Sequence, residues 1–333
     1  MDEVTRRTVM GAGVGAGLVA ATPALATGAG QMAPAQGTGD AQLQDPTTKY
    51  PRPPFQRQSQ PWPGLAAKMN PRPDHGETSY KGSGRLLGRK ALVTGGDSGM
   101  GRAAVIAFAR EGADVAFAYL PAEEPDAREV VALIQAAGRK AVPLPGDLRD
   151  PDYIKRMVAT AVRELGGLDI LVNNASRQQQ RASMAELTEE DFDATIKTNI
   201  YGTFRVTKAA LPHMPPGSVI IQTTSEQAYD PSENLVDYAM TKAAMMNFTK
   251  SLAKQLGPKG IRVNGVAPGP IWTPLQVSGG ATMEKLEQFG KSTPMGRPGQ
   301  PAELAGIYVR LAENDGSYAT GQVYGAAGGS GQP

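Results

Sequence analysis

The chain has 333 residues and a formal net charge of +2, from 34 basic and 32 acidic side chains, with no cysteine and only two histidines. Because the charges nearly balance and form no long run of one sign, we expect no nucleic-acid partner, and the lack of cysteine excludes disulfides, thiolate catalysis and sulfur-ligated metals. His75 and His213 lie far apart in the sequence, so we expect neither a histidine-based triad nor a metal site.

The first 26 residues are typical of a targeting segment. Arg6 and Arg7 precede a long uncharged stretch, and residues 24–26 (Ala-Leu-Ala) form a small-x-small cleavage signal. The glycine-rich run 11–17 is too weakly apolar for a stable membrane span. The segment resembles a twin-arginine signal for export of folded proteins, so we predict an exported, periplasmic protein. The alternative is a disordered tail on a cytoplasmic enzyme.

Residues 27–85 differ in character from the rest of the chain. Eight prolines between residues 46 and 73 break every helical or strand period. Aromatic residues such as Tyr50, Phe55 and Trp62 interrupt the segment, although a solvated linker carries few of them. From about Asp45 we therefore predict an extended arm that lies over a folded surface, either its own or that of a neighbouring subunit. A flexible spacer is the alternative.

A glycine-rich turn, residues 94–102 (TGGDSGMGR), follows the apolar run 91–93 and leads into an apolar helix. Gly95 permits a tight turn, Gly99 lets the backbone approach a pyrophosphate, and Gly101 lets helix and strand pack closely. The free N–H groups of the helix start would face the phosphates. Many such turns bind nothing, so this motif alone is weak evidence.

Strands and helices alternate through the remainder of the chain. We predict further strands at 114–119, 140–144, 168–172, 218–225, 262–267 and 322–324, and helices at 127–137, 151–165, 192–211, 236–256 and 301–312. This order predicts an α/β fold: a Rossmann-type, doubly wound parallel sheet of about seven strands with helices on both faces. It would form a single domain, 86–333, preceded by the extended arm. Residues 271–298, rich in Gly, Pro and Met, are expected to form a mobile cover over the substrate.

Tyr238 and Lys242 stand four residues apart on a predicted helix, so that they share one face. A tyrosine titrates near pH 10, and moving its pKa toward neutrality requires roughly 4 kcal/mol of preferential stabilisation of the phenolate. A lysine charge, helped by an oxidised nicotinamide, could supply that stabilisation. The same spacing is common on surface helices.

In residues 86–329 the chain resembles the short-chain dehydrogenase/reductase family. The matching motifs are the turn 94–101, Asn173-Asn174-Ala175, Asn199, Ser225 thirteen residues before Tyr238, the Tyr238/Lys242 pair, and Pro268-Gly269. Residues 45–48 (DPTT) and 269–273 (GPIWT) further resemble its glucose/ribitol-dehydrogenase-like branch. One departure is Ser176, where the family usually has glycine.

The resemblance implies roles for particular residues. Tyr238 would exchange a proton with the substrate oxygen, Lys242 would lower the pKa of Tyr238 and bind the nicotinamide ribose, Ser225 would donate a hydrogen bond to the substrate, and Asn199 would hold a water as a proton relay. The implied cofactor-binding residues are Gly95, Asp97, Ser98, Gly99, Met100, Gly101, Tyr119, Asp147, Leu148, Asn174, Ala175, Tyr238, Lys242, Pro268, Gly269, Ile271 and Thr273. Among these, Asp147 and Leu148 would face the adenine, and Ile271 and Thr273 the carboxamide.

The resemblance therefore implies an NAD(P)-dependent oxidoreductase that transfers a hydride between the cofactor and an alcohol or carbonyl compound such as an aldehyde, ketone, sugar or polyol. A non-catalytic dinucleotide-binding redox sensor or scaffold is the alternative, but such proteins typically lose the tyrosine or the lysine. The family also implies a homotetramer or dimer, paired through helices 192–211 and 236–256.

The choice between NAD and NADP rests on the end of the second strand. Tyr119 stands where an NAD-specific member carries an acid, and the only basic residues between Gly101 and Glu124 are Arg102 and Arg110, both on the first helix. The neighbourhood is acidic, with Glu123 beside Glu124. We therefore lean slightly to NAD, although these acids could equally be solvated loop charges.

Overall fold

The structure is a computed structural model in which residues 43–331 are described. The predicted targeting segment, 1–26, and the first part of the arm lie outside the described residues. Among residues 43–331, no helix combines the length and the apolar character needed to cross a membrane.

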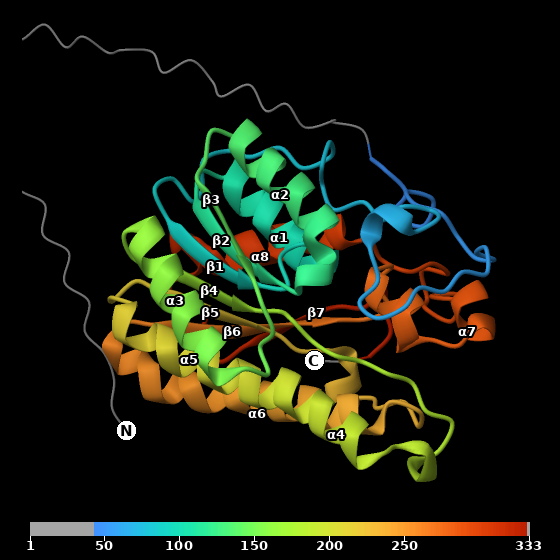
Figure 1. Cartoon of the computed structure of the whole chain (residues 1–333). Helices are drawn as coiled ribbons and strands as arrows, with labels where there is room; N and C mark the ends of the chain where they lie inside the picture. The colour runs from blue at the N-terminus through green and yellow to red at the C-terminus, as the bar shows by residue number, and fades with distance from the viewer. Residues whose placement is uncertain (1–42, 332–333) are drawn as a thin grey trace, which may run out of the picture. The chain divides into compact units, whose positions relative to one another are not determined.

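Seven parallel strands form one sheet in the order β3-β2-β1-β4-β5-β6-β7 (Figure 1). The strands are β1 (Lys90–Thr94), β2 (Asp114–Tyr119), β3 (Ala141–Pro145), β4 (Ile170–Asn173), β5 (Val219–Thr223), β6 (Arg262–Pro268) and β7 (Val323–Ala326). The strand order reverses between β1 and β4, and such switch points are where doubly wound sheets bind ligands at the carboxyl ends of their strands. The predicted fold class is confirmed.

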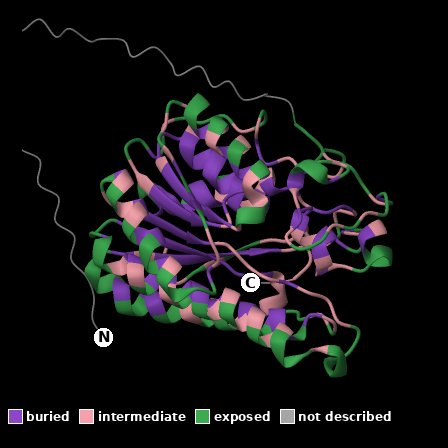
Figure 2. Ribbon diagram, in the orientation of Figure 1, coloured by how far each residue is buried: buried purple, intermediate pink, exposed green. Residues whose placement is uncertain are grey.

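Helices cover both faces of the sheet (Figure 1). On one face lie α1 (Gly99–Arg110), α2 (Glu124–Ala136) and α8 (Pro301–Ala312), and on the other α3 (Pro151–Leu165), α5 (Thr203–Ala210) and α6 (Val236–Leu256). Successive strand residues point to opposite faces: Val93 belongs to the core under α1 and α8, whereas its neighbour Leu92 belongs to the core over α3 and α6. Because both faces are covered, the five central strands are almost fully buried, as Figure 2 shows for the centre of the sheet, whereas the edge strands β3 and β7 are partly exposed.

Local capping fixes several helix boundaries at the predicted residues. Helix α3 begins at Pro151 because the Asp150 side chain accepts a hydrogen bond from Asp152 N, and it ends at Gly166, which adopts a left-handed conformation (φ 72°). Helix α2 begins at Glu124, three residues earlier than predicted, because Pro125 and two acidic side chains suit a first helical turn.

The helix predicted over 192–211 is interrupted. Helix α4 (Glu189–Ile196) joins α5 through a π-helical segment, Lys197–Gly202, which contains the buried Asn199. In such segments each backbone hydrogen bond spans one residue more than in an α-helix, and they are frequent at functional sites. Exposed Phe204 on α5 and Met240 on α6 belong to the helices expected to pair subunits; that pairing stays a prediction.

The described part of the arm lies on the chain's own surface and fastens the segment 271–298. Phe55 and Met69 of the arm share a buried cluster with Trp272, Val277 and Leu286. The rings of Phe55 and Trp272 stack with centroids 4.3 Å apart, and Phe55 N donates to Glu287 O at 2.8 Å. The segment expected to be a mobile cover is therefore bound to the arm, and it includes the short helix α7 (Met283–Glu287).

Replacing Phe55 with alanine should weaken this attachment. Because Phe55 is 7% exposed and stacked on Trp272, Phe55→Ala should lower the free energy of unfolding by about 3 kcal/mol. Urea unfolding followed by circular dichroism measures the change, with Leu87→Ala, whose side chain is 73% exposed, as the control. A loss no greater than that of the control would show that the arm adds little to the stability of the domain.

Candidate active site

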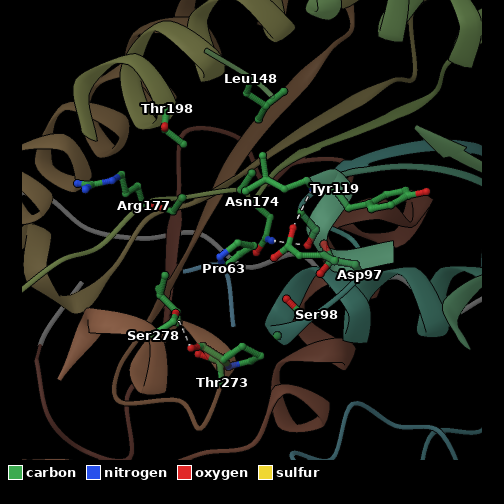
Figure 3. A pocket seen from close by; sticks show the side chains of 18 of the residues that line it. Pro63, Asp97, Ser98, Tyr119, Leu148, Asn174, Arg177, Thr198, Thr273 and Ser278 are labelled. Atoms are coloured by element: carbon green, nitrogen blue, oxygen red, sulfur yellow. Dashed lines mark hydrogen bonds between the residues drawn. The ribbon is translucent and has the colours of Figure 1, made fainter. Parts of the chain in front are cut away.

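A cavity of about 320 Å³ opens at the carboxyl edge of the sheet, beside the switch point (Figure 3). Most of the residues predicted to bind a cofactor line it: Gly95, Asp97, Ser98, Gly99, Met100, Tyr119, Asp147, Leu148, Asn174, Ala175, Tyr238, Lys242 and Thr273. The structure thus brings together residues from the ends of β1, β2, β3 and β4 with two residues of α6.

The glycine-rich turn has a geometry that requires its glycines. Gly95 and Gly99 have positive φ angles of 65° and 51°, which side chains other than glycine rarely adopt. A Cβ on Gly101 would lie 1.9 Å from the carbonyl oxygen of Gly95. The first turn of α1 therefore packs directly on the end of β1, and its start faces the cavity.

Asn174 ties the end of β4 to the end of β1. Its Nδ2 donates to Thr94 O at 3.2 Å and to Gly95 O at 3.0 Å. In return, Thr94 Oγ1 accepts from the backbone N–H groups of Asn174 (3.0 Å) and Ala175 (3.1 Å). These four bonds hold the two strand ends together beneath the cavity.

The cavity wall carries buried polar atoms without a hydrogen-bond partner in the described part of the chain. They are Asp97 Oδ2, Asn174 Oδ1 and Ser176 Oγ. Buried polar groups are normally paired, so unpaired ones around a cavity suit a polar ligand. Together with the N-terminus of α1, which favours phosphate, these atoms fit a dinucleotide. Ser176, the departure from the family pattern, adds a hydroxyl to this wall.

Tyr238 and Lys242 line the cavity, and Ser225, which does not line it, forms a side-chain hydrogen bond with Tyr238. Lys242 Nζ lies 5.3 Å from the centroid of the Tyr238 ring and donates to Thr223 O at 2.8 Å. Burial raises the pKa of Tyr238 above its usual value, while a hydrogen bond with the Ser225 side chain acts in the opposite direction. Burial lowers the pKa of Lys242 to about 7.

The lysine was expected to lower the pKa of the tyrosine. In this structure burial is the largest influence on both side chains, and it favours the neutral form of each. A positive charge placed in the cavity next to Tyr238 would oppose this effect by favouring the phenolate.

Asn199 does not line the cavity; it holds the surrounding elements in place. Its Nδ2 donates to Arg177 O and to Thr241 Oγ1, both at 3.0 Å, and its Oδ1 accepts from Arg177 N at 2.8 Å. The amide thereby links the segment after β4 to the residue next to Lys242. Its predicted role in holding a water stays a prediction.

Four residues predicted to bind the cofactor do not line the cavity: Gly101, Pro268, Gly269 and Ile271. Gly101 lies beneath the turn, against Gly95. Pro268 pairs with Ala326 of β7, and a Cβ on Gly269 would lie 2.6 Å from Ala327 Cα. The side chain of Ile271 is 4% exposed and belongs to the core under α8. These four residues pack against the elements that form the cavity and do not line the cavity themselves.

Several cavity residues were missed in the sequence. Trp62, Pro63 and Gly64 reach the cavity from the arm, and Arg149 reaches it from the turn after β3. An aromatic residue between two prolines indicated that the arm packs somewhere, but not where. Burial tends to raise the pKa of Asp147, but hydrogen bonds from Arg149 outweigh it and hold that pKa below its usual value.

The acidic residue Glu123 also lines the cavity, beside Asp97. Burial raises the pKa of Glu123 to about 9, and the charge of Asp97 adds to that effect. Burial likewise raises the pKa of Asp97 to about 7. Burial and the neighbouring charge of Asp97 thus both favour the protonated form of Glu123.

A family model described as enoyl-(acyl carrier protein) reductase matches residues 95–330, and the oxidoreductase YghA of Escherichia coli is 56% identical over 86% of this chain and 98% of its own length. The chain belongs to the short-chain dehydrogenase/reductase family. Members of this family are oxidoreductases that use a nicotinamide cofactor, and the cavity described above has the residues to hold one.

Other members are similar over nearly as much of the chain. The glucose and ribitol dehydrogenase of Daucus carota is 44% identical, covering 84% of this chain and 96% of its own length. The NADPH-dependent aldehyde reductase 1 of Arabidopsis thaliana is also 44% identical, covering 80% and 95%. Both relatives match a larger share of this chain than residues 86–333 make up, so the matches extend into the arm.

A solved structure of a short-chain dehydrogenase from Burkholderia cenocepacia in complex with NADP is similar to this one. The TM-score is 0.68 and the identity 35%, covering 74% of this chain and 98% of that chain. The shared fold is therefore that of a complete dehydrogenase.

The buried Lys242 predicts a pH-dependent stability. Its folded-state pKa is about 7, whereas an unfolded lysine titrates near 10.4. Below pH 7 both states bind the proton, and the folded state bears the whole penalty of a buried charge. Between pH 7 and about 10 only the unfolded chain binds it, so stability rises with pH in that window.

Lys242→Met should therefore stabilise the dinucleotide-free protein most at pH 6, by up to about 4 kcal/mol, less about 1 kcal/mol for the lost hydrogen bond to Thr223 O. The gain should shrink steadily toward pH 10. Thermal unfolding at a series of pH values measures it, with Lys250→Met, an exposed lysine of the same helix, as the control. A gain that does not change with pH would contradict the lowered pKa.

Proposed function

We propose that this dehydrogenase catalyses hydride transfer between a nicotinamide dinucleotide and a small alcohol or carbonyl compound, with Tyr238 as the acid and base. The observation that carries the proposal is that Tyr238 and Lys242 lie side by side at a cavity, with Ser225 hydrogen-bonded to Tyr238. The glycine-rich turn and the ends of β2 and β4 line the same cavity. A bound nicotinamide ring supplies or accepts the hydride.

The protein's own groups handle the proton. In the direction of reduction, the Tyr238 hydroxyl donates its proton to the carbonyl oxygen, and Ser225 donates a hydrogen bond to the same oxygen. Lys242, protonated, stabilises the phenolate that remains. In oxidation the same groups act in reverse. A non-catalytic sensor would not need these side chains buried side by side at a cavity.

The substrate class is proposed from the printed activities of the relatives, one acting on glucose and ribitol and one on aldehydes. The cavity offers hydrogen-bonding side chains, among them Ser176, Thr224 and Arg177, which suit a hydroxylated substrate. We propose a sugar, a polyol or a small aldehyde. A screen of these compounds with both cofactors would identify it.

Tyr238→Phe should abolish turnover while preserving dinucleotide binding. General acid-base catalysis contributes on the order of 10²–10⁴ in rate, so turnover should fall at least about 100-fold, while the Kd for the dinucleotide stays within about three-fold because the ring remains. Steady-state kinetics and fluorescence titration measure the two, with Tyr318→Phe, at a fully exposed tyrosine, as the control. Retention of more than a few per cent of turnover would refute the role of the tyrosine.

The comparisons favour NADP as the cofactor over NAD, the dinucleotide slightly preferred from the sequence. The relative from Arabidopsis thaliana is named as NADPH-dependent, and the solved structure from Burkholderia cenocepacia contains NADP. The lean to NAD rested on a missing arginine and on a nearby acid. Arg149, which follows β3, supplies a guanidinium at the cavity. Burial favours the protonated form of Glu123, which weakens its repulsion of a phosphate. We propose that Arg149 binds the 2′-phosphate of NADP.

Arg149→Ala should therefore discriminate between the two cofactors. The loss of a charge-assisted hydrogen bond, about 1.5–3 kcal/mol, should weaken NADPH binding at least about ten-fold and leave NADH binding within about two-fold. Calorimetric titration measures both, with Arg156→Ala, an exposed arginine of α3, as the control. Equal losses for the two dinucleotides, or none, would show that Arg149 does not read the phosphate.

A further inference from the structure

The cavity has a wall that does not come from the dehydrogenase domain. Trp62, Pro63 and Gly64 are consecutive residues of the arm, about thirty positions before the glycine-rich turn, and all three line the cavity. Figure 3 places Pro63 between Asn174 and Asp97 on one side and Ser278 on the other. Trp62 is 40% exposed, so it stands where the cavity meets solvent.

The segment that carries these residues is a closed loop. The Gln60 side chain bonds twice to Leu65: its Oε1 accepts from Leu65 N at 2.8 Å, and its Nε2 donates to Leu65 O at 3.1 Å. Residues 61–64 are thereby held as the tip of a loop, which we term the arm loop (residues 60–65). Two bonds from one side chain fix its width, so the tip has a defined shape.

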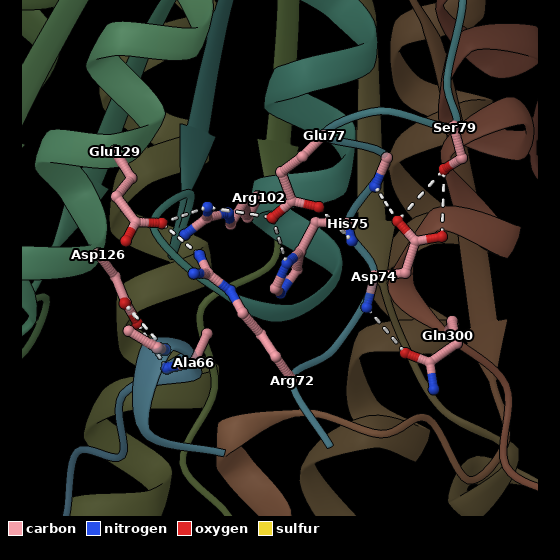
Figure 4. A network of polar contacts seen from close by, with 12 residues as sticks. Ala66, Arg72, Asp74, His75, Glu77, Ser79, Arg102, Asp126, Glu129 and Gln300 are labelled. Carbon is pink, nitrogen blue, oxygen red and sulfur yellow. Dashed lines mark hydrogen bonds and ion pairs between the residues drawn. The ribbon is translucent and has the colours of Figure 1, made fainter. Parts of the chain in front are cut away.

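The arm loop is fixed to α2 on one side. Asp126 of α2 is fully buried, and its carboxylate accepts from the N–H groups of Ala66 (2.6 Å) and Ala67 (3.2 Å), at the start of a short 3₁₀ helix directly after the loop. Figure 4 shows this contact. Bonds to a buried carboxylate are strong, so the loop is held at a set position above the end of β2.

On the other side the arm loop touches the segment 271–298. Gln60 N donates to Val277 O at 2.9 Å, and a Cβ on Gly64 would lie 3.0 Å from Pro274 O and 3.2 Å from Ser278 Cβ. Pro274 and Ser278 line the cavity as well. The arm loop and this segment therefore meet over the cavity and close it from one side.

A buried ion-pair network holds the following part of the arm on the same helices. Arg102, directly after Gly101, is 1% exposed and pairs with Glu77 of the arm at 3.1 Å and with Glu129 of α2 at 2.8 Å. His75 Nδ1 lies 2.9 Å from Glu77 Oε1, and Arg72 pairs with Glu129. Figure 4 shows these five side chains in contact. The helix that carries the glycine-rich turn is thus bonded to the arm.

We propose that the arm loop is a binding element for the nicotinamide dinucleotide: Trp62, Pro63 and Gly64 cover the bound cofactor and slow its release. The proposal rests on the proposed use of this cavity for a nicotinamide cofactor. The bound dinucleotide gains contact with an indole and a proline ring, and it is shielded from water on the side where the arm loop meets Pro274. Interactions that form only in the complex act mainly on the rate of dissociation.

The experiment measures release directly. The full-length protein is loaded with NADPH and mixed in a stopped-flow instrument with an excess of NADP⁺, and the fall in nicotinamide fluorescence gives the dissociation rate. In Trp62→Ala that rate should rise about ten-fold, with the association rate changed by less than about three-fold. Trp62→Phe should recover most of the difference because it keeps an aromatic wall. Tyr318→Ala removes an exposed aromatic side chain away from the cavity and should behave as the wild type.

A second variant, Gln60→Ala, changes the shape of the arm loop without changing a residue that lines the cavity. Gln60 does not line the cavity, and Gln60→Ala removes both bonds that close the loop while leaving Trp62 in place. It should also raise the dissociation rate, by about three-fold or more. Thermal unfolding of each variant without dinucleotide shows whether the domain remains folded.

The outcomes separate the two proposals. If the wild type binds NADPH and both variants release it at the wild-type rate, the arm loop is not a binding element, and the proposed function stands. If the wild type binds neither NADPH nor NADH, the proposed function fails and the role of the arm loop fails with it. Faster release from both variants, with Tyr318→Ala unchanged, supports the proposal.

Discussion

The site depends on the contact between the first turn of α1 and the end of β1. A helix can start this close to a strand only if nothing stands between Gly101 and the carbonyl of Gly95, where a Cβ would be 1.9 Å from oxygen. Asn174 then donates to the same carbonyl at 3.0 Å, so one side chain from the residue directly after β4 joins the two strand ends at the switch point of the sheet. The cavity walls formed by the strand ends are positioned relative to this junction, because β2 pairs with β1 and β5 pairs with β4.

Burial sets the chemistry at the inner end of the cavity. Tyr238 and Lys242 lie on one helix face, and both are withdrawn from water, so each tends toward its neutral form. A neutral tyrosine is a proton donor, as reduction of a carbonyl requires. The phenolate required for oxidation must be stabilised by charge brought close to it, from a protonated lysine or from an oxidised nicotinamide. The direction of proton transfer is thus linked to the redox state of the ligand that occupies the cavity.

Much of this could be predicted from the sequence because the signals are local. The alternation of apolar strands and helices predicted the sheet, and proline and capping residues predicted both ends of α3 and the start of α8. The π-helical segment around Asn199 could not be predicted, since its extra residue is accommodated by bonds to Arg177 and Thr241, which are distant in sequence. Arg149 was missed for a similar reason: it follows β3, and only the sheet order brings it to the cavity.

The path of the arm over the domain could not be predicted from the sequence. Prolines and aromatic residues indicated an extended segment that packs on something, but the surface beneath it is built from residues 60 to 230 positions away, such as Asp126 and Glu287. Its position over the cavity bears on the predicted export. A dinucleotide that dissociates readily has no obvious supply outside the cytoplasm, so export suits this protein only if the cofactor is held very tightly or if oxidised and reduced substrates recycle it in place. Slow release through the arm loop and export through Arg6 and Arg7 are separate proposals, and the first would support the second: a cofactor that leaves slowly stays in the cavity when the folded protein crosses a membrane.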